Sequence, residues 1–568
     1  MLKGHTLRRT LAELTDSTFD VVVIGGGISG ACLAHDAALR GLSVALVEQG
    51  DFGGATSAAS SKLLHGGIRY LQQIRFDKVR ESSQERRVLA GIAPHLIRWV
   101  PFLVPTYSDP ARGRWFLACG MRLYAWLGGA TDPVPEPNAP TSGTYYSRAE
   151  LGQRAPELAD SADVTGAFVL YESQLHSSER MTLAFLKTAA QHGAIVANYV
   201  SVDGLLWAGS RVAGVRAHDV ESGDPLEIRA RVVANAAGPW LPRFNDRFAV
   251  GSLRHAVTGM AQGAHIITRQ IMPTFGVALS TGRASGARLD RGGRHVFVIP
   301  WRGHSLIGTT NRPFDGDLDR VCPTEDDVQD LIDDVRSALP AVRLVRRDVR
   351  HAFAGIYPLT ARRLRPGVYQ GTGDYQILDH GRAGGAEGMV SALGAKYTTA
   401  RRLAELATST ICRRLDRGVD RCRTAETPLV GGVIDDVAAF TRDAVGRHAA
   451  LINRATVEHL VRHYGAEIDA VVGVTPGDSY GYRQLTSARE SIEAEVVFAV
   501  KHEMARQLAD VVFRRTGLGT LGHPGDACLR RCAAIMAPRL GWTDTARDEQ
   551  IRKTHAQFPI AESHGSES

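Results

Sequence analysis

Residues 21–51, VVVIGGGISGACLAHDAALRGLSVALVEQGD, place a short run of branched apolar residues directly before three glycines. The run is typical of a buried strand, and Gly25, Gly27 and Gly30 fill a G-x-G-x-x-G pattern. In that pattern the first glycine permits a tight turn, the second lets a pyrophosphate approach the backbone, and the third lets the next helix pack closely. We predict a strand over 21–24, a helix over 28–40 and a second strand over 43–47.

Glu48 ends the second predicted strand, roughly 20 residues after the glycines, where an acidic side chain binds ribose hydroxyls. A lone G-x-G-x-x-G is often only a glycine-rich turn. Here strand, helix, second strand and terminal acid follow in order. They favour an α/β dinucleotide-binding unit in which the N–H groups at the start of the helix face the phosphates.

Composition limits the classes of protein that this chain can belong to. Its 568 residues are enough for about two to four domains, and 44% hydrophobic and 22% charged residues are globular values. The net charge of +7 favours anionic partners such as phosphates or an acidic membrane surface. No dense Lys/Arg run with interleaved aromatics occurs, so nucleic acid is not an expected partner.

The cysteines and the N-terminal residues indicate in which cellular compartment the protein is expected. None of the seven cysteines forms a C-x-x-C pair, and Cys528 and Cys532 lack the histidine partners of a metal site. We therefore expect no metal, and reduced thiols in a cytoplasmic protein. Residues 1–20 contain no apolar stretch long enough for a signal peptide, and no run of 18 apolar residues predicts a spanning helix.

A second glycine-rich segment, DFGGATSAASSKLLHGGIRYL at 51–71, has the composition of a loop laid along a flat cofactor. Its small hydroxyl residues suit an extended backbone, and the adjoining glycines at 66 and 67 permit close approach to a ring. A flexible surface loop is the alternative interpretation, although its apolar and aromatic end is unusual for one. Farther on, VVANAAGPW at 232–240 reads as a strand that ends in small residues at a cofactor edge.

Several motifs in the same order resemble the FAD-dependent glycerol-3-phosphate dehydrogenases. They are GGGISG at 25–30, TS at 56–57, SKLLHGGIRY at 61–70, NAAGPW at 235–240, GAH at 263–265, FVIPW at 297–301, IGTT at 307–310, GAKYTT at 394–399 and the helical pattern at 493–519. The resemblance covers roughly residues 18–545. It implies FAD as the nucleotide, oxidation of a secondary alcohol to a ketone, and transfer of two electrons to a membrane quinone or to oxygen.

The resemblance also implies an architecture: an α/β fold with a discontinuous Rossmann-like FAD-binding domain, a mixed-sheet substrate domain acting as a cap, and an all-α C-terminal domain. The expected boundaries are 18–95, 160–250 and 355–410 for the FAD-binding domain, 96–159 and 251–354 for the substrate domain, and 430–555 for the helical domain. In the helical domain, the apolar residues of 493–515 recur near a 3.6 period, which is typical of core packing. A homodimer surface is the second interpretation.

The family's functional positions fall on named residues of this chain. His265 matches a histidine near the reacting carbon, and we predict it as the proton acceptor because imidazole is available as a neutral base. The alternative is a histidine that is merely satisfied within its strand. The other catalytic candidates are Arg69, Lys396 and Tyr357. The expected substrate-binding residues are Arg69, Tyr70, Lys396 and Thr399, and the expected FAD-binding residues are Gly25, Gly27, Gly30, Glu48, Thr56, Ser57, Ser61, His65, Gly66, Gly238 and Thr398.

The chain departs from the family pattern where the substrate is held. Tyr357 in AGIYPL and Gly373 in TGDYQIL stand where the family has arginines, and GTTN at 308–311 replaces Gly-Thr-Thr-Asp. Two lost guanidiniums remove several kcal/mol at about 1.5–3 kcal/mol per charged hydrogen bond. Two further hypotheses therefore stay open: a flavin dehydrogenase or oxidase of another polyol, polyol phosphate or hydroxy acid, and a flavin-binding protein without turnover.

Residues 96–128, LIRWVPFLVPTYSDPARGRWFLACGMRLYAWLG, combine tryptophans with several arginines. A helix over 112–127 with aromatic and basic residues is typical of a segment lying in the lipid headgroup plane. Packing of the aromatics inside the substrate domain is the alternative. The first interpretation predicts peripheral attachment to the inner face of the cell membrane.

Overall fold

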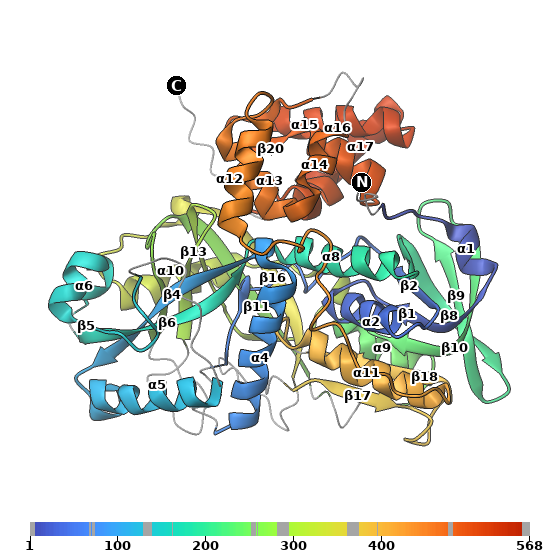
Figure 1. The fold of residues 1–568 in the computed structure, drawn as a ribbon, viewed down its shortest axis with the longest axis horizontal. Coiled ribbons are helices and arrows are strands. Elements are labelled where there is room, and N and C mark those ends of the chain that lie inside the picture. Colours follow the sequence, from blue (N-terminus) through green and yellow to red (C-terminus); the bar gives the residue numbers. More distant parts are fainter. Residues whose placement is uncertain are drawn as a thin grey trace.

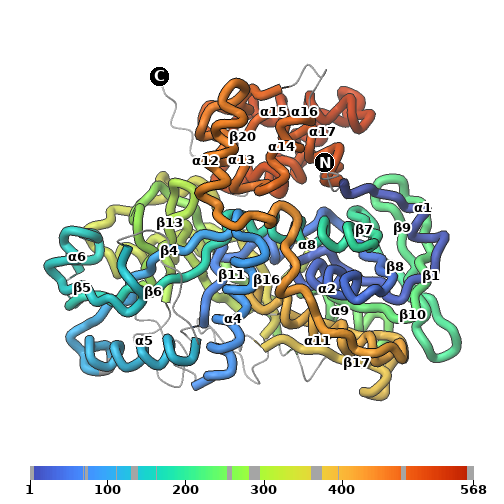
Figure 2. The backbone as a smooth tube through the Cα atoms, viewed as in Figure 1, coloured from blue at the N-terminus to red at the C-terminus, as the bar shows by residue number. Residues whose placement is uncertain are grey.

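A computed structural model describes residues 6–67, 70, 74–128, 139–161, 163–251, 257, 259–280, 295–359, 374–394, 396–474 and 481–558. Two sheets lie side by side, and a helical domain covers both of them (Figure 1). The segment between residues 415 and 436 runs across this junction to the helical domain (Figure 2).

The first sheet has eight described strands, ordered β17-β18-β10-β1-β2-β7, with β8 and β9 continuing from β10. The neighbouring pairs among β18, β10, β1, β2 and β7 are parallel, as expected of a nucleotide-binding sheet. Its strands are β1 (Thr18–Ile24), β2 (Val44–Glu48), β7 (Ile195–Asn198), β8 (Val200–Ala208), β9 (Arg211–Asp219), β10 (Pro225–Asn235), β17 (Gln376–Asp379) and β18 (Met389–Leu393). The helices around it are α1 (Leu11–Thr15), α2 (Ile28–Leu39), α8 (Ser178–Gln191), α9 (Leu241–Arg247) and α11 (Ala400–Arg414).

The predicted strand, helix and second strand of the nucleotide unit are confirmed as β1, α2 and β2, with each end within three residues of its predicted position. All residues of β1 after Thr18 are buried, which explains why its sequence is an unbroken apolar run rather than an alternating one. Helix α2 is buried along nearly its whole length between α8 and α11. This packing accounts for its small and apolar residues.

The second sheet has ten described strands and contributes the other wall of the site. Its path is β15-β11-β14-β13-β12-β4-β6-β3, with β16 paired to β11 and β5 to β6. The strands are β3 (Leu63–Leu64), β4 (Ile97–Tyr107), β5 (Tyr145–Ser147), β6 (Val164–Leu175), β11 (Gly259–Arg269), β12 (Gly276–Ser280), β13 (His295–Trp301), β14 (His304–Gly308), β15 (Arg312–Phe314) and β16 (Val349–Leu359). Its helices are α4 (Phe76–Ile92), α5 (Arg114–Gly128), α6 (Arg148–Arg154), α7 (Pro156–Ala159) and α10 (Glu325–Ala338).

Strand β6 lies in the second sheet, although residues from 160 onward were expected in the FAD-binding domain. It pairs antiparallel with β4 from Ile97 opposite Leu175 to Tyr107 opposite Val164. The reason is that an apolar run predicts a buried strand without naming its partner. The exact domain boundaries otherwise remain predictions. A capping box between Thr324 and Asp327 fixes the start of helix α10.

The C-terminal domain is helical, with one small hairpin in addition to the expected helices. Its elements are α12 (Val437–His448), α13 (Arg454–Tyr464), α14 (Ile468–Val472), β19 (Gln484–Thr486), β20 (Arg489–Ile492), α15 (Glu493–His502), a π-helical turn (Asp510–Arg515), α16 (Asp526–Leu540) and α17 (Asp544–His555). The apolar residues predicted for core packing, among them Val496, Leu508 and Val511, are buried inside this domain.

The single helix expected over 493–515 is wrong. Helix α15 ends at His502, and Met504 has a φ of +56°. The reason is tertiary. The buried Arg515 donates from Nε and Nη2 to the carbonyl of Glu503 at 3.1 and 2.9 Å, and the Glu503 carboxylate pairs with Arg180 at 2.6 Å. These contacts occupy backbone and side-chain groups at the point where the helix would have continued.

Candidate active site

The glycine turn after β1 is as tight as the sequence pattern predicts. Gly25 has a φ of +104°, and a Cβ there would lie 2.9 Å from the carbonyl oxygen of Ala236. A Cβ on Gly30 would lie only 1.9 Å from the carbonyl oxygen of Gly25. The first and third glycines therefore let β1, β10 and α2 approach one another. Gly30 packs against the backbone of the turn and does not line the cavity.

Glu48 organises the rim of the same turn. Its carboxylate accepts hydrogen bonds from the backbone N–H groups of Gly26 at 2.7 Å and Gly50 at 2.8 Å. Burial is the largest cause of the shift in the pKa of Glu48, and it raises that pKa above its usual value. Ser57 adds a further contact to the turn, since its Oγ accepts from the N–H of Ile28 at 2.9 Å.

A cavity of about 500 Å³ runs from this turn to the inner face of the second sheet. It begins at the carboxyl ends of β1 and β2, where ligands of open α/β sheets bind. Twelve of the residues predicted from the sequence line it: Gly25, Gly27, Glu48, Thr56, Ser57, Ser61, His65, Gly238, His265, Tyr357, Lys396 and Thr398.

Four of the other predicted site residues lie outside the cavity lining. Besides Gly30, these are Gly66, Tyr70 and Thr399. The N–H of Gly66 donates to Glu172 at 2.7 Å, Tyr70 is buried, and Thr399 precedes α11. Their roles in binding remain predictions. Arg69, Gly373 and the arginines at 362, 363 and 365 lie outside the described residues.

His265 on β11 is the buried imidazole of the cavity. Its Nε2 lies 2.9 Å from the Ser61 hydroxyl, and its ring stacks on Phe353 with centroids 5.2 Å apart. Its Nδ1 is buried and has no hydrogen-bond partner among the described residues. Burial, helped by the nearby charge of Lys62, lowers the pKa of His265 to about 3. The ring is therefore neutral, which is the state that accepts a proton.

Lys396 and Tyr357 line the same cavity as His265. The Lys396 ammonium lies 3.8 Å from the centroid of the Tyr70 ring and 3.5 Å from the Ser82 hydroxyl. The Tyr357 hydroxyl donates to the side-chain oxygen of Asn311. The site thus combines a neutral base, a cation and neutral hydrogen-bonding groups, a set suited to a small anionic alcohol.

A family model described as FAD dependent oxidoreductase matches residues 20–402, and a model for the C-terminal domain of alpha-glycerophosphate oxidase matches residues 422–547. The chain is 31% identical over 560 residues to "Glycerol-3-phosphate dehydrogenase" of Synechocystis, covering 96% of this chain and 97% of that one. It belongs to the glycerol-3-phosphate dehydrogenase family of FAD-dependent oxidoreductases. It is 34% identical over 555 residues to "Glycerol-3-phosphate dehydrogenase 2" of Mycobacterium tuberculosis, covering 95% and 88%.

A solved structure has the same fold. The glycerol-3-phosphate dehydrogenase from Bacillus halodurans complexed with FAD superimposes with a TM-score of 0.73 at 23% identity, covering 97% of each chain. FAD is the cofactor of this family, and the cavity fits it. A Cβ on Gly27 would meet only the Ser57 hydroxyl, at 3.1 Å, and a Cβ on Gly238 would meet nothing within 4 Å. Bare backbone therefore faces open space at both positions, as a pyrophosphate-binding wall requires.

Two side chains at departures from the family pattern contact each other. Tyr357 and Asn311, which replace an arginine and an aspartate, bind each other. Lys62 is buried and pairs with Glu179 at 2.7 Å, while it also donates to the carbonyl of Ala58 at 2.7 Å. Lys62 thus holds the loop at 51–62 against α8.

Several cavity residues were missed by sequence reasoning. Trp240, Arg243 and Arg247 come from the segment after β10, Ser201 and Val202 from β8, and Thr309 from the end of β14. Of the residues after β10, only Trp240 lies within a motif that we had singled out, NAAGPW at 235–240, and that motif was chosen for its small residues. The strand β8 reaches the cavity because it crosses the end of β2, which no local pattern in the sequence indicates.

Proposed function

We propose that this protein oxidises sn-glycerol 3-phosphate to dihydroxyacetone phosphate. The observation that carries the proposal is the neutral, buried His265 in the same cavity as the Lys396 ammonium and the glycine turn. Bound FAD accepts the two electrons that leave the alcohol carbon. The relatives named glycerol-3-phosphate dehydrogenase support the choice of this alcohol.

The proton of the alcohol hydroxyl passes to His265 in this proposal. Ser61 fixes the ring through Nε2, and Phe353 fixes its plane. A pKa of about 3 makes the ring a weak base before substrate binds. An anionic substrate places negative charge beside the ring and raises its pKa toward the working pH.

The substrate phosphate requires a cation, and Lys396 is the described lysine in the cavity lining. Replacing Lys396 by alanine should raise KM, or lower kcat/KM, about tenfold or more while FAD stays bound, because one charge-assisted contact contributes about 1.5–3 kcal/mol. Steady-state kinetics with a soluble electron acceptor measures the effect. Lys553→Ala, an exposed change on α17, is the matched control and should leave both constants unchanged. Equal kinetics in the two variants would exclude this role.

Anaerobic reduction of the flavin tests the reaction itself. Glycerol 3-phosphate should bleach the flavin absorbance of the purified protein rapidly, while glycerol without its phosphate should act far more slowly because Lys396 then has no anionic partner. Bleaching by another alcohol but not by glycerol 3-phosphate would favour a different polyol, polyol phosphate or hydroxy acid. A flavin that no alcohol bleaches would favour a flavin-binding protein without turnover.

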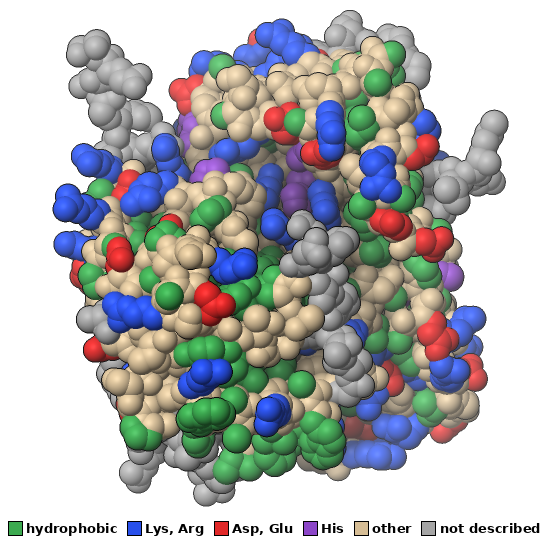
Figure 3. Space-filling model, turned by 60° about the vertical axis from the view of Figure 1, so that its left-hand side comes forward, with side chains coloured by type: hydrophobic (Ala, Val, Ile, Leu, Met, Phe, Trp, Pro, Cys, Tyr) green, Lys and Arg blue, Asp and Glu red, His purple; other side chains and the backbone are tan. Residues whose placement is uncertain are grey.

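We further propose that electrons leave to a quinone at a membrane surface. No helix in the described part of the chain is long and apolar enough to cross a bilayer. Helix α5, however, buries only Met121, Tyr124 and Leu127, whereas Trp115 and Trp126 are 79% and 70% exposed. Hydrophobic and basic side chains gather along the lower part of the face in Figure 3, at the height of α5 in Figure 1. Oxygen is the alternative acceptor, and no observed contact bears on a homodimer.

Flotation with anionic liposomes tests this attachment. The wild type should float at low salt and less at high salt, since lipid charge attracts the arginines and salt screens them. The Arg112→Glu/Arg114→Glu double variant should float several-fold less. A control with the same charge change elsewhere, Arg229→Glu/Arg530→Glu, should float like the wild type. Wild type that stays in the bottom fraction at low salt would contradict the proposal and favour oxygen or a soluble carrier as the acceptor.

A further inference from the structure

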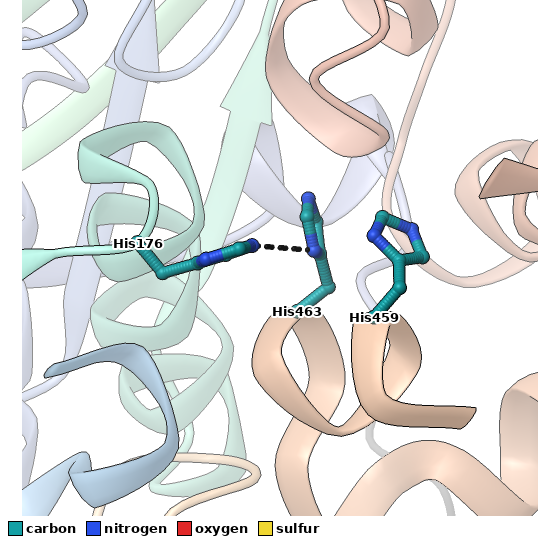
Figure 4. Close-up of side chains that lie close together, drawn as sticks. All are labelled: His176, His459 and His463. Atoms are coloured by element: carbon teal, nitrogen blue, oxygen red, sulfur yellow. Dashed lines mark hydrogen bonds between the residues drawn. The ribbon is translucent and has the colours of Figure 1, made fainter. Parts of the chain in front are cut away.

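Three histidines meet where the helical domain covers the oxidoreductase domain. His176 follows β6, and His459 and His463 lie one turn apart on α13 (Figure 4). Nε2 of His176 is 3.0 Å from Nδ1 of His463, and one nitrogen from each ring lies within 4.8 Å of the others. Histidine and basic side chains are visible in the hollow at this junction in Figure 3. None of the three lines the flavin cavity.

The spacing of these rings is close to that of metal ligands. Two nitrogens bound to one tetrahedral Zn²⁺ at about 2.0–2.1 Å are about 3.3 Å apart, so the His176–His463 pair needs to open by only a few tenths of an ångström. His459 and His463 are four residues apart on a helix, which places both rings on one face. Figure 4 shows the His463 ring between the other two.

The His463 ring has hydrogen-bonding capacity that the surrounding protein does not use. It is 1% exposed, and its Nε2 has no hydrogen-bond partner among the described residues. A buried polar atom without a partner is costly, so the surrounding protein holds this ring by Nδ1, the nitrogen that faces His176, and by packing. Burial also disfavours the charged imidazolium, and the neutral ring is the form that coordinates metals.

Glu495 supplies the second feature of a built metal site. Its carboxylate accepts from Nε2 of His459 at 3.0 Å, which leaves the other nitrogen of that ring for an ion. Histidine ligands are commonly oriented by a carboxylate in this manner. Glu495 is fully buried, and it also accepts a hydrogen bond from the Tyr464 hydroxyl at 3.2 Å. Three arginines lie near the rings: Arg180 pairs with Glu503 at 2.6 Å, Arg302 donates to the Thr520 hydroxyl at 3.0 Å, and Arg462 lies on α13 beside His463.

We propose that His176, His459 and His463 bind a Zn²⁺ ion that fastens the helical domain to the oxidoreductase domain, with Glu495 orienting His459. Three imidazole nitrogens favour Zn²⁺ over Mg²⁺ or Ca²⁺, which prefer oxygen ligands. A water completes the fourth position. No sequence spacing predicted the site, because His176 and His463 are 287 residues apart.

The test uses full-length, FAD-loaded protein stripped of metal with EDTA and titrated with Zn²⁺ by calorimetry. The wild type should bind about one Zn²⁺ per chain with a rise in Tm. His176→Gln and His463→Gln should lose both, and Glu495→Gln should bind about 10–100-fold more weakly. The matched control is His523→Gln, in a second cluster with Asp526 and His555, and it should behave like the wild type.

Each other outcome overturns the proposal. Stripped wild type that binds no more Zn²⁺ than a His176→Gln/His463→Gln double variant would leave the cluster as a hydrogen-bonded core contact. If only His523→Gln lost Zn²⁺ binding, the ion would be assigned to the second cluster instead. Flavin content and circular dichroism, compared with stripped wild type, show whether a variant has folded. Anomalous scattering at the zinc edge from wild-type crystals grown with Zn²⁺ locates the ion without any variant.

Discussion

Replacing Gly27 by valine is expected to leave a folded protein that binds little or no flavin. In the described structure a Cβ at this position meets only the Ser57 hydroxyl, at 3.1 Å, so the fold accommodates it with a small adjustment. The valine methyls then project into the cavity at the wall where we predict the pyrophosphate to bind. FAD affinity should fall more than about tenfold, which is about 1.4 kcal/mol or more. The flavin absorbance per chain of the purified protein measures it.

Gly91→Val is the control for Gly27→Val. Gly91 lies on α4, and a Cβ there meets nothing within 4 Å. Gly91→Val should keep about one FAD per chain. When flavin is removed from the wild type and from Gly27→Val, the two apoproteins should have the same circular dichroism spectrum. A yellow Gly27→Val protein with full occupancy would show that the pyrophosphate does not lie against this turn.

His265→Gln is expected to lower kcat by about 10²–10⁴ while FAD remains bound, because the variant loses the group that takes the hydroxyl proton. Glutamine keeps a hydrogen bond to Ser61 within reach but is not a base. Rapid-reaction measurement of flavin reduction isolates this step from reoxidation. His304→Gln, on the neighbouring β14 and outside the cavity lining, should reduce the flavin at the wild-type rate.

The low pKa of His265 gives the same variant a second readout. Burial holds the pKa near 3 in the folded protein, against 6.5 for an unperturbed histidine. Between these values the unfolded chain binds more protons than the folded one, so the stability contributed by His265 is complete above pH 6.5 and is lost as the pH falls toward 3. Thermal unfolding of His265→Gln should therefore depend less on pH in that window than unfolding of the wild type. Identical pH dependence together with an unchanged rate of flavin reduction would show that His265 is only a strand residue.

The nucleotide-binding unit was predictable because its sequence signals are local. A buried parallel strand needs an apolar run, a tight turn needs a glycine, and a helix packed against both needs small residues. These requirements act over about thirty residues, so β1, α2 and β2 could be located before their partners in the sheet were known.

The contacts around the site could not be predicted in this way, because they join residues far apart in the sequence. Ser61 and His265 are 204 residues apart, and nothing in either segment indicates that their side chains meet. The break after His502 could not be seen either, because the period of 493–515 fits a continuous helix, whereas Arg515 binds the carbonyl of Glu503 in the folded chain. Contacts between distant residues override local preference at such points.

The sequence by itself thus determined the nucleotide-binding unit, the family and the candidate residues around FAD, since each rests on a motif that is readable within one segment. Only the tertiary structure decided that β6 belongs to the second sheet, that Tyr357 binds Asn311, and that His176 meets α13. The physical reason is that strand pairing, side-chain partners and the burial that shifts a pKa depend on which segments pack together, and that packing is a property of the whole chain.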